Sequence, residues 1–478
     1  MAMLLNELLE RADVPCVVAG GLTSDSRSVR PGDVFVAYKG RDFDGHDFVE
    51  EAVQRGAVAV CAENPVGDAL PVPWIQVSDL ANRRGALAAK FYGHPSREMQ
   101  TIGVTGTNGK SSVAYGTASL LESTACIGTI GWGIPPFLCS STLTTVDPIT
   151  MQHVMADLLR RNVRRAVVEV SSHALSQDRV DELRISCAVF TNLTRDHLDY
   201  HSNMEDYGRA KFRLFERTEL QTGIVNIDDS FGKEIEEHLR ERGIDCYTFG
   251  ETSRADLHWR DVEFTEKGIR GRWISPWGTT RFSIPYRGSM YLFNAAAMLL
   301  IAVHCGMDFQ EAVSRMHSAV QIPGRMEYVS KTGMPALVLD YAHTPDALRA
   351  ALDAVRSHTS GRVVCVFGCG GDRDQGKRSE MARVAQSLAD YVVVTSDNPR
   401  FEDPLQIMEE IRQGLSRKDA HFEEPDRTKA IAHAIGSAEK EDTVLVAGKG
   451  HERYQEIQGV RHPYSDRATI QTLLGMRG

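Results

Sequence analysis

TIGVTGTNGKSS, residues 101–112, is the stretch from which the organisation of this chain follows. Thr101 to Thr105 has the apolar and β-branched composition of a short buried strand, and residues from Ser111 onward favour a helix. A glycine-containing loop between a strand and a helix presents backbone N–H groups to an anion, and the helix dipole favours negative charge there. We therefore predict an ATP-type phosphate site in the loop formed by Gly106, Thr107, Asn108 and Gly109.

The residues after this loop extend the predicted site. Lys110 can reach the outer phosphates of a nucleotide, and a hydroxyl of Ser111 or Ser112 can help to hold Mg²⁺. The spacing departs from the strict G-x-x-x-x-G-K-[ST] pattern, because Val104 stands where the first glycine belongs. The alternative is a glycine-rich turn without a ligand, and we favour the phosphate site.

Length and composition indicate a multidomain globular enzyme. The chain has 478 residues, which suggests about three domains, and 42% of them are hydrophobic. A net charge of −10 argues against nonspecific nucleic-acid binding, which needs a basic surface. Nine scattered cysteines without a C-x-x-C pair favour a reducing compartment over a structural zinc site. We see neither a signal peptide nor an apolar run of about 18–20 residues, and we expect a cytoplasmic protein.

Residues 1–95 are expected to form a small α/β domain that binds a polar ligand. The short apolar strands VFVA (34–37) and AVAVC (57–61) alternate with polar loops, but no regular strand–helix alternation is evident. Ser24, Ser26 and the segment Arg41-Asp42-Phe43 are the candidate binding residues in these loops. On the sequence alone they could equally be ordinary turn formers.

The second section, residues 96–325, places polar side chains at the ends of further strands. AVVEV (166–170) has Glu169 near its carboxyl end, and a polar turn with His197 follows the strand at 188–191. A carboxylate at such a position in a nucleotide-binding sheet is where a Mg²⁺ ligand belongs. We predict a metal site shared by Glu169 and His197, the alternatives being a core ion pair and a structural histidine. For Lys211, helical spacing alone favours a surface lysine whose stem covers apolar neighbours.

The third section, residues 326–478, alternates cleanly between strands and helices. The strands ALVLDYA, RVVCVFG, YVVVTSD and TVLVAG predict a parallel, doubly wound sheet of Rossmann type. Ligands of such sheets bind beyond the carboxyl ends of the strands, where this sequence is unusually polar. FGCGGDRDQGK begins a G-x-G pattern, but Arg373 replaces the third glycine, which disfavours a dehydrogenase. The polar residues at these strand ends are Asp340, His343, Asp372, Arg373, Asp397, Asn398, Arg400, Lys449, His451 and Glu452.

Ten motifs distributed over essentially the whole chain resemble those of the Mur ligases of peptidoglycan assembly. In chain order they are TGTNGKSS, EVSSHALSQDRV, TNLTRDHLDYH, YGRAKFRLFER, PGRME, DYAHTPDAL, FGCGGDRDQGKR, SDNPR, AGKGHE and YSDR. Ser111-Ser112 is a departure, because the family usually has Thr-Thr there, but the hydroxyls are retained. The resemblance implies an α/β protein of three domains. Residues 1–95 would bind the UDP substrate, 96–325 would form a P-loop-type ATPase domain, and 326–478 would bind the incoming amino acid.

The resemblance also implies a reaction. ATP, with Mg²⁺, would phosphorylate the free D-Glu carboxylate of UDP-N-acetylmuramoyl-L-Ala-D-Glu, and the amine of the third amino acid would attack the acyl phosphate. A monomer without nucleic-acid or membrane partners is expected. The run Asp397-Asn398-Pro399-Arg400 resembles the sequence of family members that accept meso-2,6-diaminopimelate. The second carboxylate of this amino acid can pair bidentately with a guanidinium, which Arg400 would supply. The alternatives are the lysine-adding ligase, a folylpolyglutamate synthetase-like ligase and a nucleotide-binding switch.

The residues that match the family's functional positions fall into five groups. Lys110, Lys211 and His197 match catalytic positions, and the metal would be held by Ser111, Glu169, His197 and Lys211 as a carbamate. Besides the phosphate loop, Asn294, Arg325 and Asp340 match contacts to ATP. The matches for the UDP-sugar peptide are Ser26, Arg41, Asp42, Phe43, Thr144, Thr145, Ser171, Gln177 and Arg179, to which we add Ser24. Those for the amino-acid pocket are Arg373, Asp397, Asn398, Pro399, Arg400, Gly448 and Glu452.

Overall fold

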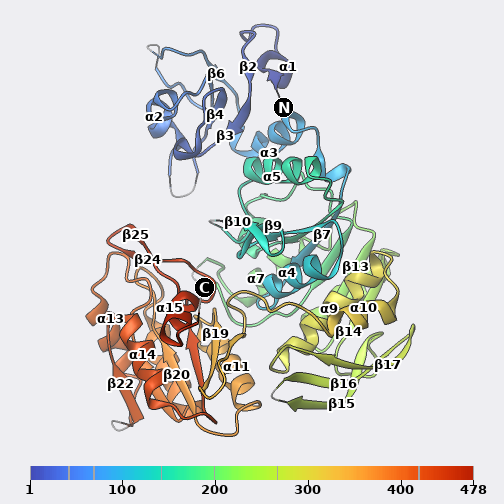
Figure 1. Cartoon of the computed structure of the whole chain (residues 1–478). Helices are drawn as coiled ribbons and strands as arrows, with labels where there is room; N and C mark the ends of the chain where they lie inside the picture. Colours follow the sequence, from blue (N-terminus) through green and yellow to red (C-terminus); the bar gives the residue numbers. More distant parts are fainter. Residues whose placement is uncertain are drawn as a thin grey trace.

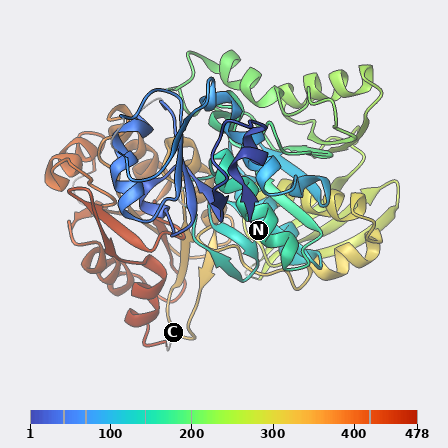
Figure 2. The ribbon, with the colours of Figure 1, turned by 90° about the horizontal axis from the view of Figure 1, so that it is seen from above.

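The computed structural model describes residues 2–40, 43–67, 70–141, 143–198, 200–265, 267–417 and 420–476. It contains three α/β domains in chain order, as the sequence predicts, with the central domain between the other two (Figure 1). Viewed from above, the N-terminal domain lies in front, with the C-terminal domain to one side and the later elements of the central domain to the other (Figure 2). In the described ranges no helix has the length and apolar character needed to cross a bilayer.

The N-terminal domain is built on a parallel four-stranded sheet of order β3-β4-β5-β6. These strands are Gly21–Thr23, Asp33–Ala37, Ala59–Ala62 and Trp74–Gln76, flanked by α1 (Leu5–Leu9), α2 (Val49–Gln54) and α3 (Leu80–Phe91). The regular parallel order was not expected, because strands of 3 to 5 residues give too little pattern to detect. A small pair, β1 (Met3–Leu4) and β2 (Val18–Ala19), completes it.

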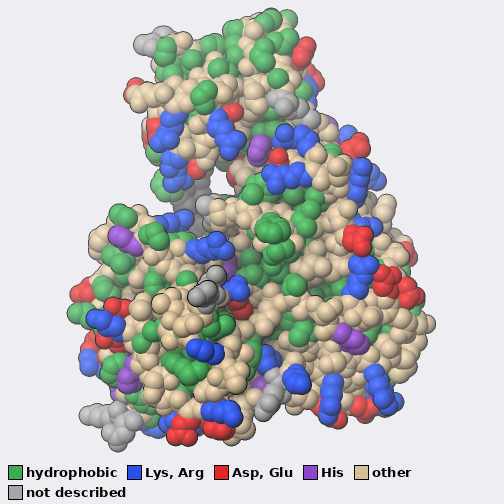
Figure 3. All heavy atoms as spheres, viewed as in Figure 1, with side chains coloured by type: hydrophobic (Ala, Val, Ile, Leu, Met, Phe, Trp, Pro, Cys, Tyr) green, Lys and Arg blue, Asp and Glu red, His purple; other side chains and the backbone are tan. Residues whose placement is uncertain are grey.

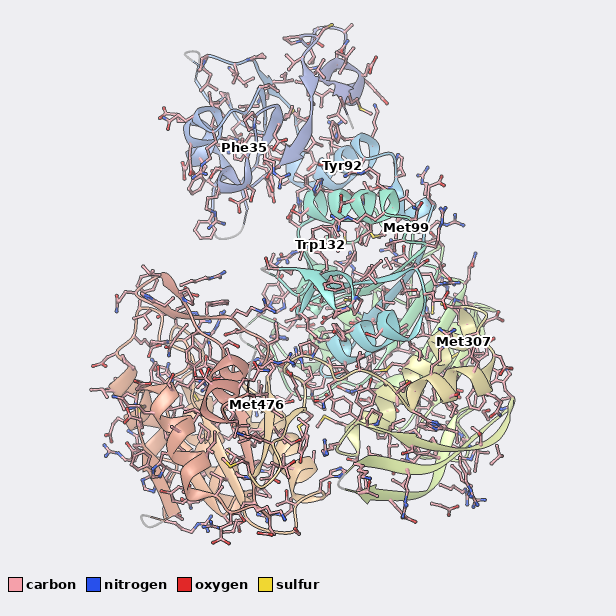
Figure 4. The ribbon with its side chains drawn as sticks, viewed as in Figure 1. Phe35, Tyr92, Met99, Trp132, Met307 and Met476 are labelled. Atoms are coloured by element: carbon pink, nitrogen blue, oxygen red, sulfur yellow. The ribbon has the colours of Figure 1, made fainter. Side chains whose placement is uncertain are left out.

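Tyr92, just after α3, ties this domain to the central one (Figure 4). Its hydroxyl accepts a hydrogen bond from the backbone N–H of Leu22 at 3.4 Å, and its ring lies 5.4 Å from that of His153 on α5 (Pro148–Arg160). The N-terminal and central domains are therefore in side-chain contact at this junction, in addition to being joined by the chain.

The central domain holds an eight-stranded sheet of order β10-β9-β8-β11-β7-β12-β13-β14. Six strands are parallel, namely β7 (Gln100–Thr105), β8 (Thr124–Gly128), β11 (Arg165–Glu169), β12 (Cys187–Phe190), β13 (Thr222–Asn226) and β14 (Asp245–Phe249). At one end of the sheet, β9 (Gly131–Ile134) and the edge strand β10 (Phe137–Cys139) are antiparallel. The helices of the central domain are α4 (Lys110–Leu120), α5, α6 (Ser172–Ser176), α7 (Met204–Phe212), α8 (Ser230–Glu241), α9 (Met290–His304) and α10 (Phe309–Met316).

A separate antiparallel sheet follows the large one and consists of β15 (His258–Thr265), β16 (Gly268–Ser275) and β17 (Gly278–Ile284). Trp273 is fully buried there and stacks on Phe282 with ring centroids 4.3 Å apart. The neighbouring helix α9 is buried on nearly all sides, because alanines such as Ala295 to Ala297 let the sheet and α4 approach closely. Its end is set by Gly306, which has the left-handed φ of 89° expected of a C-terminal glycine.

The C-terminal domain has the predicted doubly wound sheet, of order β18-β19-β23-β20-β21-β22. The parallel strands are β19 (Ala336–Asp340), β23 (Thr443–Ala447), β20 (Val363–Phe367), β21 (Tyr391–Val394) and β22 (His421–Glu423), and β18 (Glu327–Val329) is antiparallel. Two separate apolar clusters fill its two faces. The helices are α11 (Pro345–Arg356), α12 (Gly376–Leu388), α13 (Pro404–Arg412), α14 (Arg427–Ser437) and α15 (Asp466–Leu473), and a hairpin of β24 (Tyr454–Ile457) and β25 (Val460–Pro463) protrudes.

Candidate active site

The phosphate loop lies between β7 and α4, and its tight conformation depends on two glycines. Gly106 and Gly109 have φ values of 144° and 90°. A Cβ atom would lie 1.9 Å from Thr191 Oγ1 at the first position and 2.4 Å from Asn294 Oδ1 at the second. Only glycine fits both positions, so the loop conformation is fixed by its sequence. No described side chain caps the N-terminus of α4, which leaves its N–H groups directed at the space above the loop.

Lys110 is folded back on the loop. Its ammonium donates hydrogen bonds to the carbonyls of Gly106 and Thr107, both at 2.8 Å. Burial lowers the pKa of Lys110, while Glu169 and Asp196 oppose that change. The cation therefore belongs to the first residue of α4, and the nearby carboxylates of Glu169 and Asp196 favour its charged form.

Glu169 ends β11 and is only 2% exposed. Ser111 Oγ donates to its Oε2 at 2.9 Å, and Thr129 donates from its backbone N–H to Oε1 at 2.8 Å. Burial raises the pKa of this carboxyl, and the nearby Lys110 counteracts the rise. The carboxylate and the Ser111 hydroxyl form a preformed pair of hard oxygen donors, which suits Mg²⁺.

Lys211 is buried, so the surface lysine favoured by helical spacing is wrong. Its side chain lies on α7 with 1% exposure, and Nζ donates to the carbonyl of Gly106 at 3.0 Å. Nζ also lies 4.2 Å from the centroid of the Tyr207 ring. Burial, and then the proximity of Lys110, hold the pKa of Lys211 well below its ordinary value. Spacing could not reveal this, because a buried lysine and a snorkelling one occupy the same helical positions.

His197 follows β12 in a loop and adopts a left-handed φ of 54°. Its ring lies 4.9 Å from that of His173 and 6.0 Å from that of Tyr207. Among the described residues there is no cluster of three or more His, Cys, Asp or Glu side chains that could hold a metal ion. The metal site shared by Glu169 and His197 therefore stays a prediction, with the Ser111–Glu169 oxygen pair as its preformed part.

Two of the three residues matched to ATP contacts, Asn294 and Arg325, reach the phosphate loop or the start of α4. Asn294 on α9 lies against Gly109, and Arg325 Nη2 donates to Ser111 Oγ at 3.1 Å. The Arg325 guanidinium also lies 4.6 Å from the centroid of the Tyr341 ring. Asp340 accepts hydrogen bonds at 2.8 Å from the N–H groups of Met326 and Ala342 and thereby fixes the chain on either side of β18 and β19.

A cavity of about 880 Å³ separates the central and C-terminal domains. The predicted site residues Thr144, His197, Arg373, Asp397, Asn398, Arg400, Gly448 and Glu452 line it. Arg195, Tyr341 and Lys377 also line it and were missed as site residues. All three lie inside motifs quoted above, and the polar character of these motifs was the signal that could have identified them as site residues.

Buried polar contacts hold the C-terminal wall of this cavity. Lys449, with none of its side chain exposed, donates to Asn398 Oδ1 at 2.9 Å and to Glu452 Oε2 at 2.8 Å. Asn398 Nδ2 donates to the same Glu452 oxygen at 2.9 Å. Gly448 has a φ of 114°, and a Cβ there would lie 2.5 Å from Asp397 Oδ2. Pro399 is buried, whereas Arg400 is partly exposed at the cavity.

The residues matched to the UDP-sugar peptide fall into two groups. In the central domain, Arg179 Nη1 donates to the Thr145 carbonyl at 2.9 Å and Arg179 Nε to Gln177 Oε1 at 3.0 Å. Thr145 Oγ1 donates to Ser171 Oγ at 3.3 Å, and Thr129 Oγ1 donates to Thr144 Oγ1 at 3.0 Å. These five predicted residues therefore lie together beside Glu169.

In the N-terminal domain, Ser26 is buried and donates to Glu51 Oε2 at 2.6 Å, Ser24 is half-buried, and Phe43 is 75% exposed. Arg41 and Asp42 lie outside the described residues. Arg84 was missed. It donates to the Gln177 carbonyl at 3.2 Å, and its guanidinium lies 5.0 Å from the Tyr38 ring centroid, so it connects the two groups. Figure 3 shows a hollow below the N-terminal domain with Lys and Arg side chains at its rim.

Comparison with known proteins places this geometry in a family. Residues 19–92 match the model of the Mur ligase family, catalytic domain, residues 104–302 the Mur ligase middle domain, and residues 324–450 the Mur ligase, glutamate ligase domain. A Coxiella burnetii protein named UDP-N-acetylmuramoyl-L-alanyl-D-glutamate–2,6-diaminopimelate ligase is 41% identical over 476 residues, 97% of each chain.

Two solved structures extend the comparison. One, titled as a UDP-N-acetylmuramoyl-L-alanyl-D-glutamate–2,6-diaminopimelate ligase, is 33% identical and covers 99% of each chain with a TM-score of 0.68. Mycobacterium tuberculosis folylpolyglutamate synthase, solved with ADP and AMPPCP, covers 76% of this chain and 92% of its own with a TM-score of 0.63. At 17% identity this second likeness is one of fold alone.

Proposed function

The chain belongs to the Mur ligase family, and from this premise we propose that it joins 2,6-diaminopimelate to UDP-N-acetylmuramoyl-L-alanyl-D-glutamate in peptidoglycan synthesis, with hydrolysis of ATP. One observation carries the proposal. A single cavity is lined by His197 of the nucleotide-type domain on one side and by Arg373, Arg400 and Glu452 of the C-terminal domain on the other. Such a cavity can bring an activated carboxylate to the amine of a second, charged substrate.

The chemistry follows from the substrates. A carboxylate is a poor electrophile at neutral pH, and its phosphorylation by ATP supplies a leaving group. The amine of the amino acid then attacks the acyl carbon, and phosphate departs from a tetrahedral intermediate. The Lys110 ammonium can give up its hydrogen bonds to the two loop carbonyls and bind phosphoryl oxygens instead. It would then neutralise the negative charge that develops on these oxygens.

The residues present suit Mg²⁺. Ser111, Glu169 and His197 would hold it, and it would neutralise charge on the transferred phosphoryl group. Lys211 would contribute as a carbamate. A neutral amine is the form that adds CO₂, and burial next to Lys110 favours the neutral amine. The carbamate would also place an anion beside the Lys110 cation, which is an attractive pair.

Arg400 supports diaminopimelate, in its meso form, over lysine. The distal carboxylate of diaminopimelate can pair bidentately with a guanidinium, whereas lysine offers only an ammonium there. Asp397, Asn398, Pro399, Gly448 and Glu452 complete the proposed amino-acid pocket. The lysine-adding ligase remains the second candidate, and a folylpolyglutamate synthetase-like activity is supported by fold alone.

The remaining assignments belong to the same proposal. The domains are residues 1–95, 96–325 and 326–478, and the protein acts as a cytoplasmic monomer. The UDP moiety lies in the hollow below the N-terminal domain, whose basic rim suits a pyrophosphate (Figure 3).

The test is the substrate dependence of ADP release by the purified chain. Release should require the UDP-dipeptide and diaminopimelate together. ADP release that depends on lysine, or on a folate substrate in place of the UDP-dipeptide, would overturn the proposal.

A further inference from the structure

Two loops carry the arginines of the proposed amino-acid pocket, and they lie directly against each other. The first, 368–375, contains Arg373, and the second, 397–403, contains Arg400. A Cβ on Gly371 would lie 2.0 Å from the carbonyl oxygen of Pro399, and one on Gly370 would lie 2.9 Å from Arg400 Nη1. Gly371 therefore permits an approach of the two backbones that a larger residue would not allow.

The Arg400 backbone is held in an uncommon conformation. Its φ is 50°, and its guanidinium donates to the carbonyl of Gly371 at 2.6 Å. Such a backbone persists in a residue other than glycine only where its surroundings fix it. Hydrogen bonds from Arg400 N to the Glu456 carbonyl, and from Gln458 N to the Arg400 carbonyl, fix one side of this residue.

The other side is fixed by Glu402 and Arg378, which do not line the cavity. Arg378 on α12, with none of its side chain exposed, donates to both Glu402 oxygens at 2.8 and 2.9 Å. Glu402 Oε1 also accepts the backbone N–H of Asp372 at 2.5 Å, and Asp372 Oδ2 accepts the N–H of Phe401 at 3.2 Å. The Glu402 carboxylate is thus the point at which α12 and both pocket loops meet.

We propose that Glu402, anchored by Arg378, is a positioning residue that sets the distance between Arg373 and Arg400 and thereby the selectivity for an amino acid with a distal carboxylate. The inference rests on the proposed function, because it requires that these arginines bind the amino acid. Binding by two guanidinium groups is sensitive to their separation, since a misplacement of about 1 Å can cost up to about 100-fold in rate.

The chain supplies a matched control. Glu410 on α13 also accepts a hydrogen bond from Arg378, at 2.8 Å, and its side chain is 22% exposed against 21% for Glu402. No described contact joins Glu410 to the loop 368–375. Glu402→Gln and Glu410→Gln therefore each weaken one ion pair of Arg378, but only the first also disturbs the loops.

The experiment measures KM for diaminopimelate, ATP and the UDP-dipeptide, together with the thermal midpoint, in the full-length variants. Glu402→Gln should raise KM for diaminopimelate about tenfold and lower its preference over lysine, with the other two KM values unchanged. Glu410→Gln should lose comparable thermal stability and keep all three KM values. Glu402→Asp, which keeps the charge with a shorter reach, should lie between wild type and Glu402→Gln.

Equal KM values for diaminopimelate in Glu402→Gln and Glu410→Gln would overturn the positioning role, as would a parallel rise in all three KM values. Arg400→Ala, measured alongside, separates this failure from failure of the proposed function. If Arg400→Ala raises KM for diaminopimelate and Glu402→Gln does not, only the positioning role is wrong. If neither variant changes it, the assignment of the pocket itself is wrong.

Discussion

Truncation of Arg400 to alanine should convert a ligase selective for diaminopimelate into a poor and unselective one. The guanidinium lines the cavity and reaches the Gly371 carbonyl at 2.6 Å, so it is already oriented before the amino acid arrives. Removing one partner of a buried charge pair costs about 2–5 kcal/mol. Because Arg400 is partly exposed, we expect the lower part of that range, about 2–3 kcal/mol, which corresponds to about 30- to 150-fold in kcat/KM.

The assay is kcat/KM for diaminopimelate and for lysine at saturating ATP and UDP-dipeptide. The value for lysine should stay unchanged or rise, because its ammonium no longer faces a like charge. Arg400→Lys, which keeps the charge without the planar fork, should recover part of the loss. Arg461→Ala removes an exposed cation on the neighbouring hairpin and controls for the loss of one positive charge near the cavity. A wild type that prefers lysine, or an Arg400→Ala variant that loses both activities equally, would refute this reasoning.

Three further predictions concern the phosphate loop, the buried lysine and the domain contact. Lys110→Ala should lower kcat by about 10²–10³, since it removes a cation from the transferred phosphoryl group, and near-normal turnover would contradict the ATP site. Lys211→Ala should be largely inactive and partly restored by added acetate or formate, whereas full activity without rescue would exclude the carbamate. His451 Nε2 lies 3.0 Å from the Thr129 carbonyl of the central domain, and burial lowers the pKa of His451 to about 4. Because the unfolded chain binds this proton more readily, stability should fall as pH drops from about 6.5 toward 4, by about 2 kcal/mol at pH 5. Thermal midpoints of wild type and His451→Asn between pH 5 and 8 check this, and identical pH profiles would contradict it.

The sequence was sufficient to predict the fold class and much of the site because these features depend on local pattern. The central and C-terminal strands are apolar runs bounded by turn residues, and β7, β11, β12, β19, β20 and β23 lie within one or two residues of the predicted strands. The strand β21 starts where predicted and ends three residues earlier, at Val394 rather than Asp397. Glu169 and the polar ends of the C-terminal strands could be placed because parallel strands end at one edge of a sheet. The short strands around Val36 gave no comparable pattern, so their parallel order was not predicted.

Other features depend on contacts between distant segments and could not be predicted from local pattern. The burial of Lys211 results from the phosphate loop 105 residues away in sequence, whose Gly106 carbonyl accepts its hydrogen bond. Arg84 lies on α3 and Tyr38 follows β4, so the contact between them joins segments that are far apart in the sequence. Lys377 and Arg195 belong to motifs that were recognised, but their positions on the cavity wall follow from the arrangement of the two domains.

The central claim is the identity of the amino acid that this ligase adds, and the mass of the product tests it most directly. The enzyme is incubated with ATP, Mg²⁺, UDP-N-acetylmuramoyl-L-alanyl-D-glutamate and equimolar meso-diaminopimelate and lysine, and the UDP-linked product is analysed by mass spectrometry. We predict one product whose mass has increased by a diaminopimelyl residue, with one ADP released for each product formed. A product carrying lysine, or ADP release without any extended nucleotide, would contradict the account.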